Sequence, residues 1–206
     1  MTKSFQTQHD TLLAHLSEHA MARSHELRAL GVAATTISRA VEDGVVTRLG
    51  RGLYQLSESE IDANSALAEV SKRAPKAVIC LTSALAFHEL TDQMPRAVWI
   101  AIGQKDWAPG FDYPKMRIVR FRKAALEGGI EHHDVSGVTV PIYSVAKSLA
   151  DAFRNPKLVD RSVAIEALKT ALASGKASPA EIAKTSKEHR AWTRMQPYLE
   201  ALTSNG

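Results

Sequence analysis

The alternation of apolar and polar positions predicts three helices at the start of the chain. The first helix carries a single apolar stripe made of Leu12, Leu13, Leu16 and Ala20. Ser24 is suited to cap a second, short helix over residues 25–30, which Gly31 would end in a left-handed conformation. A third helix is predicted from about Thr35 to just before Gly44. Its buried side consists of Ile37, Ala40 and Val41.

A hairpin is predicted after the third helix. Residues 45–48 and 53–56 are β-like runs on either side of Leu49-Gly50-Arg51-Gly52, in which two glycines suit a tight turn. Three helices followed by a hairpin is the element order of a winged helix-turn-helix. A module of this kind places its third helix in the major groove of DNA.

The exposed positions of this module have the chemistry expected of DNA contacts. Hydroxyl groups reach phosphates or base edges, and a guanidinium group can bind a guanine or a phosphate. The N–H groups at the start of the third helix also favour phosphate. The candidate contacts are Thr35, Thr36, Ser38 and Arg39 on the third helix, and Arg48 and Arg51 on the hairpin, or wing. Winged folds also bind proteins, so a protein-docking module is the alternative.

A polar, acidic stretch over residues 57–64 predicts a boundary between a first domain, residues 1–57, and a second domain, residues 65–206. The second domain is predicted to be mixed α/β and to end in several helices, so the whole chain is of the α+β class. The expected strands are 77–81, 97–102, 116–121, 130–134 and 137–142. The expected helices are 65–73, one that is capped by Thr82 or Ser83, 144–154, 160–174, 179–187 and 190–202.

The composition is that of an ordinary globular protein. Of 206 residues, 45% are hydrophobic and 23% are charged, which is too apolar for a disordered chain. No apolar run approaches the roughly 20 residues that cross a bilayer, and the N-terminus does not resemble a secretory signal. The single cysteine, Cys80, cannot form an internal disulfide and is expected to be a buried, inert thiol. We therefore expect a cytoplasmic protein without membrane contact.

The distribution of charge adds a second candidate surface. The net charge of +4 is too small to indicate nucleic acid by itself. Residues 115–123, however, include five cations: Lys115, Arg117, Arg120, Arg122 and Lys123. This run is either an edge strand that charge protects from aggregation or a surface that contacts the phosphates of DNA or RNA.

The sequence contains no recognisable catalytic signature. It lacks the phosphate-binding loop, the dinucleotide fingerprint, the nucleophile elbow, the zinc-protease motif and the paired aspartates of nucleotidyltransferases. His132 and His133 are adjacent on a predicted strand and point to opposite faces, so they are poorly placed to share a metal. His15 and His19 share a helix face, but no third ligand is evident. We expect neither catalysis nor a metal or other cofactor, and an enzyme with an unrecognised site is a further alternative.

Two motifs of the first domain resemble those of AbiEi-type antitoxins. They are G-V-x-x-x-T-aliphatic at residues 31–37 and G-x-aliphatic-x-R-aliphatic-x-R-G-x-Y at residues 44–54. In the second domain, residues 77–90 resemble the family's strand followed by S-A-L-x-x-(H/L)-x-L, and residues 137–151 resemble its strand leading to R-T-L-x-D. Lys147-Ser148 stands where the family usually has Arg-Thr. Ala33-Ala34 replaces positions that are often polar or basic.

The resemblance implies a bacterial antitoxin that represses its own operon through the winged domain. It also implies that the second domain counters a nucleotidyltransferase-like toxin of an AbiE-type phage-defence operon without forming a stable complex. Because Ala33 and Ala34 leave few base-reading side chains, we expect two copies to bind an inverted repeat in the operator DNA cooperatively. The alternative is an antitoxin that neutralises its toxin by direct contact and uses the winged domain for docking.

Overall fold

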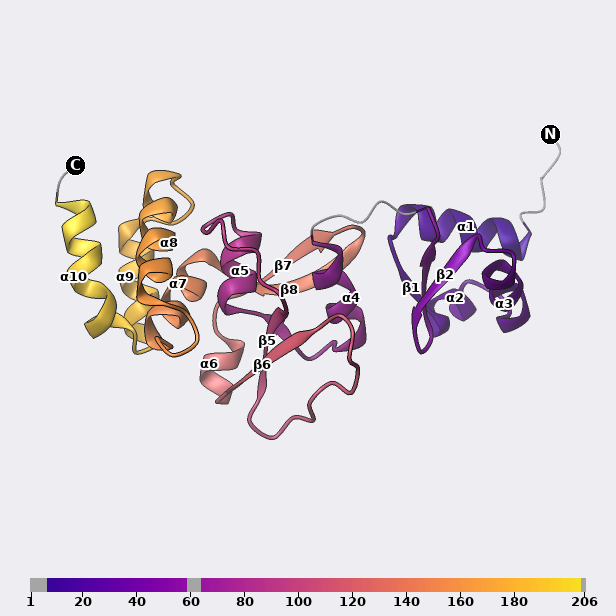
Figure 1. Ribbon diagram of the computed structural model, residues 1–206, viewed down its shortest axis with the longest axis horizontal. Coiled ribbons are helices and arrows are strands. Elements are labelled where there is room, and N and C mark those ends of the chain that lie inside the picture. Colours follow the sequence, from indigo (N-terminus) through magenta and orange to yellow (C-terminus); the bar gives the residue numbers. More distant parts are fainter. Residues whose placement is uncertain (1–6, 59–63, 205–206) are drawn as a thin grey trace. The chain divides into compact units, whose positions relative to one another are not determined.

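A computed structural model of the protein describes residues 7–58 and 64–204 (Figure 1). The chain divides into two compact units, one made of Met1–Lys72 with Asp134–Thr139 and the other of Arg73–His133 with Val140–Gly206. Residues 59–63 of the predicted boundary lie outside the described residues. The division into domains 1–57 and 65–206 therefore stays a prediction.

The residues before this boundary form helices and short strands in the order α1, β1, α2, α3, β2, β3 (Figure 1). Their bounds are Gln8–Glu18 for α1, Ala22–Arg23 for β1, Ser24–Ala29 for α2, Ala34–Glu42 for α3, Val46–Gly50 for β2 and Leu53–Leu56 for β3. The strands make an antiparallel sheet in the order β1-β3-β2. The predicted helices and hairpin are confirmed, and their order fits a winged helix-turn-helix.

Two details of this part differ from the expectation. Strand β1 was not predicted, because two residues are too few to show an alternating pattern. The cap of α2 is Arg23 rather than Ser24, which is the first helical residue. The backbone N–H of Arg23 donates to the carboxylate of Glu26 at 2.6 Å, so an acidic side chain in the first turn ties down the start of this short helix.

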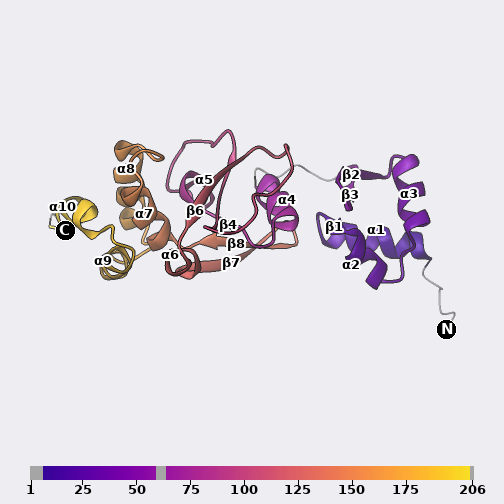
Figure 2. The ribbon, with the colours of Figure 1, turned by 90° about the horizontal axis from the view of Figure 1, so that it is seen from below.

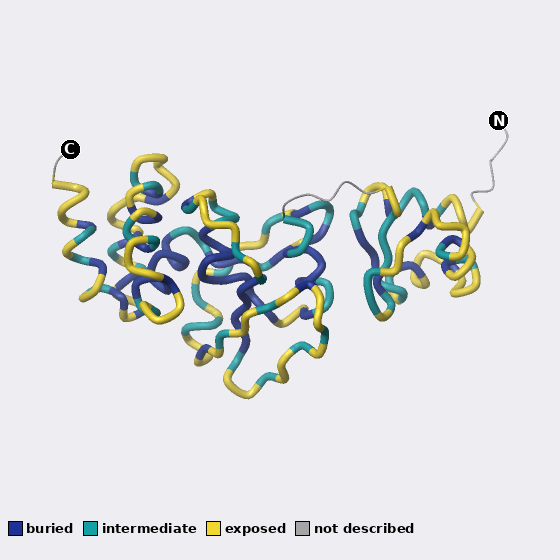
Figure 3. The backbone as a smooth tube through the Cα atoms, viewed as in Figure 1, coloured by how far each residue is buried: buried dark blue, intermediate teal, exposed yellow. Residues whose placement is uncertain are grey.

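A small core holds the N-terminal helices together. Thr7 and Asp10 form a reciprocal capping box at the start of α1, in which each side chain accepts the backbone N–H of the other residue. The core consists of Leu12, Leu16, Ala22, Leu27, Val32, Ile37, Ala40 and Val46. Ile37 and Ala40 repeat at helical spacing on α3, so the opposite face of this helix is turned to solvent (Figure 3).

The rest of the chain combines a five-stranded sheet with helices. The strands are β4 (Val78–Ile79), β5 (Val98–Gly103), β6 (Met116–Phe121), β7 (Ile130–Val135) and β8 (Val138–Tyr143). The helices are α4 (Ser65–Arg73), α5 (Leu81–Phe87), α6 (Lys123–Glu127), α7 (Val145–Arg154), α8 (Arg161–Ala173), α9 (Pro179–Glu188) and α10 (Trp192–Thr203). The sheet order is β6-β5-β4-β8-β7, with both parallel and antiparallel pairs. The chain is thus mixed α+β, as predicted.

The predicted elements of this part are found, with two differences. The first strand is shorter than expected, because α5 begins at Leu81 (φ 47°) inside the predicted strand 77–81. Helix α6 was not expected, because its five residues include no buried one and so lack an apolar stripe. Strands β7 and β8 are neighbours in the sheet, and Ser136 and Gly137, at φ 52° and 73°, lie in the turn between them.

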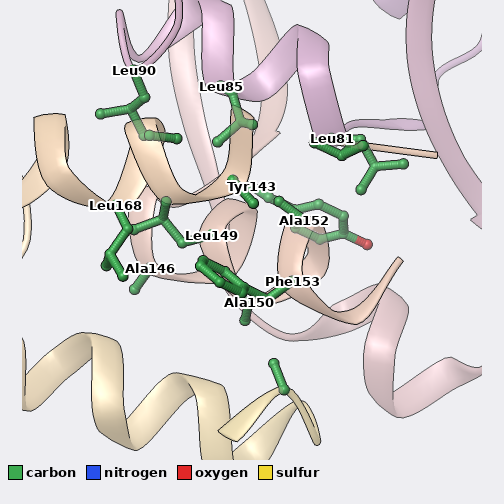
Figure 4. Packing of buried hydrophobic residues seen from close by; sticks show 14 of the residues in the cluster. Leu81, Leu85, Leu90, Tyr143, Ala146, Leu149, Ala150, Ala152, Phe153 and Leu168 are labelled. Carbon is green, nitrogen blue, oxygen red and sulfur yellow. The ribbon is translucent and has the colours of Figure 1, made fainter. Parts of the chain in front are cut away.

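Helix α7 lies at the centre of the larger core. It contacts α5, α8, α9 and α10, and it lies between the sheet and the C-terminal helices (Figures 1 and 2). Leu149 and Phe153 of α7 belong to the same buried cluster as Leu85 of α5 and Leu168 of α8 (Figure 4). Because neighbours surround this helix, its polar side chains are buried together with its apolar ones.

Candidate nucleic-acid interface

The outward face of α3 carries the residues that the sequence indicated for DNA contact. Thr35, Ser38 and Arg39 are exposed, whereas Thr36 is partly buried. Burial of Ile37 on the opposite side fixes this orientation, because a helix turns the same face inward every three to four residues. The helix therefore presents two hydroxyl groups and a guanidinium group to solvent.

Gln8, in the first turn of α1, holds the start of α3. Its Oε1 atom accepts the Ala33 N–H at 3.0 Å and the Thr36 hydroxyl at 2.9 Å. Ala33, the N-cap residue, has no side chain that could accept the first N–H groups of the helix, and the backbone N–H that Gln8 accepts is that of Ala33 itself. Within the described residues, the N–H groups of Ala34 and Thr35 have no protein acceptor, which leaves them available to a phosphate. Sequence reasoning missed Gln8, because no local pattern shows which element lies opposite α3.

The wing is the hairpin of β2 and β3, and its turn consists of Arg51 and Gly52. Strand β2 extends across a bulge to Gly50, so the turn is shorter than the predicted one. Gly52 has a φ of 67°, a left-handed conformation that favours glycine. Two hydrogen bonds hold the turn. Ser24 donates its N–H to the Gly52 carbonyl at 2.9 Å, and the Arg23 guanidinium donates to the Arg51 carbonyl at 3.2 Å.

The three candidate arginines of the module are exposed, and none has an acidic partner among the described residues. Arg48 and Arg51 lie exposed on the wing, and Arg48 Nε donates to the Gly50 carbonyl at 3.2 Å. In the described parts of the chain, neither of them nor Arg39 forms an ion pair with a carboxylate. Glu42 lies at the far end of α3 from Thr35. Cations that the protein itself does not neutralise can replace the counterions of DNA phosphates.

Strand β6 carries the second candidate surface, and it lies at an edge of the five-stranded sheet. Its region exposes all five predicted cations: Lys115, Arg117, Arg120, Arg122 and Lys123. Arg120 donates to three carbonyl oxygens at the end of β5 and in the segment after it, at 2.8–3.2 Å. Arg117 lies over the ring of Trp99, 5.1 Å from its centre. The edge position agrees with protection by charge, and Arg120 additionally fixes the neighbouring loop.

A cavity of about 460 Å³ lies beside this strand. Its basic lining residues are Arg120, Arg122, Arg154, His189 and Arg190. His189 is buried, and desolvation together with the positive charges of Lys147 and Arg154 lowers its pKa to about 4. The imidazole is therefore neutral at pH 7, so the positive charge of the cavity comes from the arginines.

Two further features of the sequence belong to the core. Lys147 and Asp151, in the segment that resembles R-T-L-x-D, are both fully buried and pair with each other on α7. Cys80 is buried as expected, and burial raises the pKa of its thiol. Neither feature reaches the surface on which a macromolecule would bind.

Comparison with known proteins bears on the N-terminal module. Residues 10–57 match the family model described as "Transcriptional regulator, AbiEi antitoxin". The resemblance to AbiEi antitoxins is confirmed. The AbiEi match extends from α1 to β3 and so includes every candidate contact on α3 and the wing. It supports a role as an antitoxin and transcriptional regulator, with DNA and a toxin as general classes of partner. The AbiEi-like motifs at residues 77–90 and 137–151 lie beyond the match and stay predictions.

The fold as a whole is similar to a solved structure. It is the crystal structure of RV2827C protein from Mycobacterium tuberculosis, with a TM-score of 0.58 and 13% sequence identity over 96% of this chain and 82% of that chain. At this identity the likeness shows a shared fold. No curated protein is significantly similar in sequence. Within residues 7–58 and 64–204, no helix combines the length and the apolar character needed to cross a membrane.

Proposed function

We propose that this protein is a DNA-binding autorepressor and antitoxin of an AbiE-type toxin–antitoxin operon. In this proposal the N-terminal part is a winged helix-turn-helix whose helix α3 lies in the major groove of operator DNA. The observation that carries the proposal is the set of exposed arginines on α3 and the wing, which have no acidic partner among the described residues, within a module that matches AbiEi regulators.

Each proposed contact follows from the placement of its group. Arg39 reaches a guanine edge or a phosphate from the exposed face of α3, and the hydroxyls of Thr35 and Ser38 bind phosphate or base edges beside it. Arg48 and Arg51 bind the adjacent backbone or minor groove from the wing. Thr36 orients α3 through Gln8 and contributes less to the DNA surface than the sequence suggested.

The antitoxin half of the proposal concerns the rest of the chain. It counters a nucleotidyltransferase-like toxin without forming a stable complex, and it does so without catalysis, in the cytoplasm, as part of phage defence. The AbiEi match supports the antitoxin role in general. The lack of a catalytic motif in the sequence supports a non-enzymatic mode of action.

Binding of the DNA upstream of the operon tests the proposal. Fluorescence anisotropy would compare the full-length parent with Arg39→Ala, Arg51→Ala and the control Arg161→Ala, which removes an exposed arginine on α8. We expect Arg39→Ala and Arg51→Ala each to weaken binding by about 1–3 kcal/mol, with unchanged folding by circular dichroism. The control should bind like the parent. Parental affinity in both test variants would refute the assignment of α3 and the wing.

The stoichiometry on the operator tests the mode of binding. One module with few base-reading side chains binds weakly, and a second copy on an inverted repeat raises the effective concentration. Native mass spectrometry should find two copies on the intact operator, and a half-site should bind one copy with lower affinity. A complex of one copy on the intact operator would remove the cooperative model.

A further inference from the structure

Three potential metal ligands converge between the end of α5 and the edge strand β7. His88 is the residue that ends α5, and Glu131 and His133 lie two residues apart on β7. Alternate residues of a strand point to the same face, so Glu131 and His133 are neighbours, while His132 points away. One ligand atom from each of the three side chains lies within 4.8 Å of the other two. Nε2 of His133 is 3.2 Å from Oε2 of Glu131.

A hydrogen bond to the main chain of β8 orients the ring of His88. Its Nε2 atom lies 2.7 Å from the carbonyl oxygen of Tyr143, at the end of β8. A carbonyl only accepts hydrogen bonds, so Nε2 carries the proton and Nδ1 keeps its lone pair. Metal-binding imidazoles are oriented in the same way, with one ring nitrogen donating to a carbonyl or carboxylate and the other available to the metal. Phe87 packs edge-on against both imidazole rings and limits their rotation.

We propose that His88, Glu131 and His133 bind one divalent transition-metal ion, with Zn²⁺ as the physiological ligand. Two imidazoles and one carboxylate are a set that Zn²⁺ binds well, whereas Mg²⁺ and Ca²⁺ prefer oxygen ligands alone. Three protein ligands leave a fourth tetrahedral position for water or another small ligand.

The separation of the ligand atoms is compatible with this ion after small side-chain movements. Zinc–nitrogen bonds of about 2.0–2.1 Å place tetrahedral ligand atoms about 3.4 Å apart. Glu131 is exposed and His133 is partly exposed, so both side chains have room to close the remaining distance. His88, which the Tyr143 carbonyl holds, is the fixed ligand of the three.

The bound ion would join two elements that the sequence keeps far apart. The end of α5 already has a second attachment, because Lys176 Nζ donates to the His88 carbonyl at 2.7 Å and pairs with Glu89 at 2.7 Å. Among the described residues, strand β7 lies at an edge of the sheet and has β8 as its one strand neighbour. A metal bridge between His88 and β7 would therefore stabilise this edge against local opening.

A second pair of neighbouring histidines is the alternative place for a metal ion to bind. His15 of α1 and His19, the residue that follows the end of α1, have ring centres 4.3 Å apart. In the described residues, no third histidine, cysteine or carboxylate completes a metal-binding group around them. This pair therefore provides a control for adventitious binding to surface histidines.

Zinc titration of the full-length, tag-free protein after treatment with a chelator tests the proposal. Calorimetry should find one Zn²⁺ per chain, and Co²⁺ should give the visible absorption of a four-coordinate site. His88→Ala and His133→Ala should each lower the affinity by more than about 100-fold, because they remove a direct ligand. The adjacent variant His132→Ala and the double variant His15→Ala/His19→Ala should bind like the parent.

The variant Glu131→Gln distinguishes the loss of a metal ligand from the loss of the fold. Glu131 is exposed, so this variant should keep the parental urea midpoint in chelator while it loses at least about 10-fold in zinc affinity. Three outcomes would overturn the proposal. They are zinc binding that survives both single histidine variants, zinc binding that is lost in His15→Ala/His19→Ala, and a preference for Ca²⁺ or Mg²⁺ over Zn²⁺. The absence of stoichiometric binding would overturn it as well. DNA binding enters none of these measurements, so they stand apart from the proposed regulatory function.

Discussion

Nζ of Lys147 lies 2.5 Å from Oδ2 of Asp151, one turn further along α7, and neither side chain is exposed. Arg154 adds a second cation, 2.9 Å from the other carboxylate oxygen. The Lys147 ammonium also lies 4.4 Å from the centre of the Tyr143 ring. Burial lowers the pKa of Lys147 and raises the pKa of Asp151, and the attraction between the two charges opposes both changes. Each of the two buried charges therefore depends on the other for its stabilisation.

Removing one member should therefore destabilise the fold strongly. Asp151→Asn leaves Lys147 buried without its counter-charge, and we expect the free energy of unfolding to fall by about 3–5 kcal/mol. The double variant Lys147→Met/Asp151→Leu should recover most of this loss, because it removes both buried charges. Arg154, which is partly exposed, can then turn to solvent. Urea denaturation of the variants would measure these differences.

The chain contains a matched exposed pair for comparison. Lys123 and Glu127 of α6 have the same spacing of four residues, 3.9 Å apart, and are largely exposed. Glu127→Gln should change the free energy of unfolding by less than about 1 kcal/mol, because solvent screens an exposed pair. If Asp151→Asn had an equally small effect, Lys147 would not be a buried charge that needs a partner.

Stability should depend on pH through His189. Its pKa in the folded protein is about 4, whereas an unperturbed histidine has a pKa of 6.5. Between these values the unfolded chain binds a proton that the folded protein does not, so the free energy of unfolding falls as the pH drops through this range. We expect the loss between pH 7.5 and pH 5 to be about 2 kcal/mol larger in the parent than in His189→Gln.

His132 provides the control for this experiment. It is exposed on β7, so His132→Gln should show the parental dependence of stability on pH. Equal losses of stability in the parent and in His189→Gln would show that the pKa of His189 is the same in the folded and the unfolded protein, and would contradict this prediction.

Gln8 should influence DNA binding without touching DNA. Gln8→Ala removes the acceptor for the Ala33 N–H and the Thr36 hydroxyl, so the start of α3 loses its attachment to α1. Water can replace both bonds, and we expect a stability loss of only about 1 kcal/mol. The free energy of operator binding should fall by more than the free energy of unfolding does. His9→Ala, the next residue and also exposed, should leave anisotropy titrations unchanged, and equal affinities of the two variants would contradict this role.

Salt dependence should decide the role of strand β6. Arg117→Gln/Arg122→Gln keeps Arg120, whose bonds to the loop after β5 are structural. If these residues contact phosphates, the slope of log affinity against log salt should become shallower by roughly 0.9 for each lost contact. Lys157→Gln/Lys184→Gln, which removes two exposed cations elsewhere, should keep the parental slope. An unchanged slope in the first variant would assign β6 to edge protection alone.

Local signals in the sequence were enough to predict α3 and the wing. The spacing of Ile37 and Ala40 marks the buried face of α3, and Gly44 marks its end, so the helix is found within one residue of its expected start. Gly52 marks the turn of the wing by its need for a positive φ. These features depend on residues close in sequence, and for that reason a single sequence reveals them.

The features that the sequence did not reveal depend on contacts between distant residues. Gln8 of α1 contacts Ala33 at the start of α3, and His88 lies close to residues of β7 that are more than forty positions further along the chain. Neither contact has a local signature in the sequence. The burial of Lys147 follows from the helices that surround α7, and its immediate neighbours in sequence do not distinguish it from a lysine on a helix surface. Element α6 was missed for a different reason, since five residues without a buried one carry no periodicity.

In the proposed regulator, the attachment of the wing turn to the start of α2 has a consequence for how DNA sequences would be discriminated. Because Arg23 and Ser24 donate hydrogen bonds to the carbonyls of Arg51 and Gly52, we expect the wing of the proposed regulator to keep its separation from α3 when DNA binds. In the proposed regulator, the duplex must then adjust to a rigid protein template. Operators whose groove width and bendability match this fixed spacing will bind more tightly, and base pairs that no side chain touches will contribute to specificity through the energy of DNA deformation.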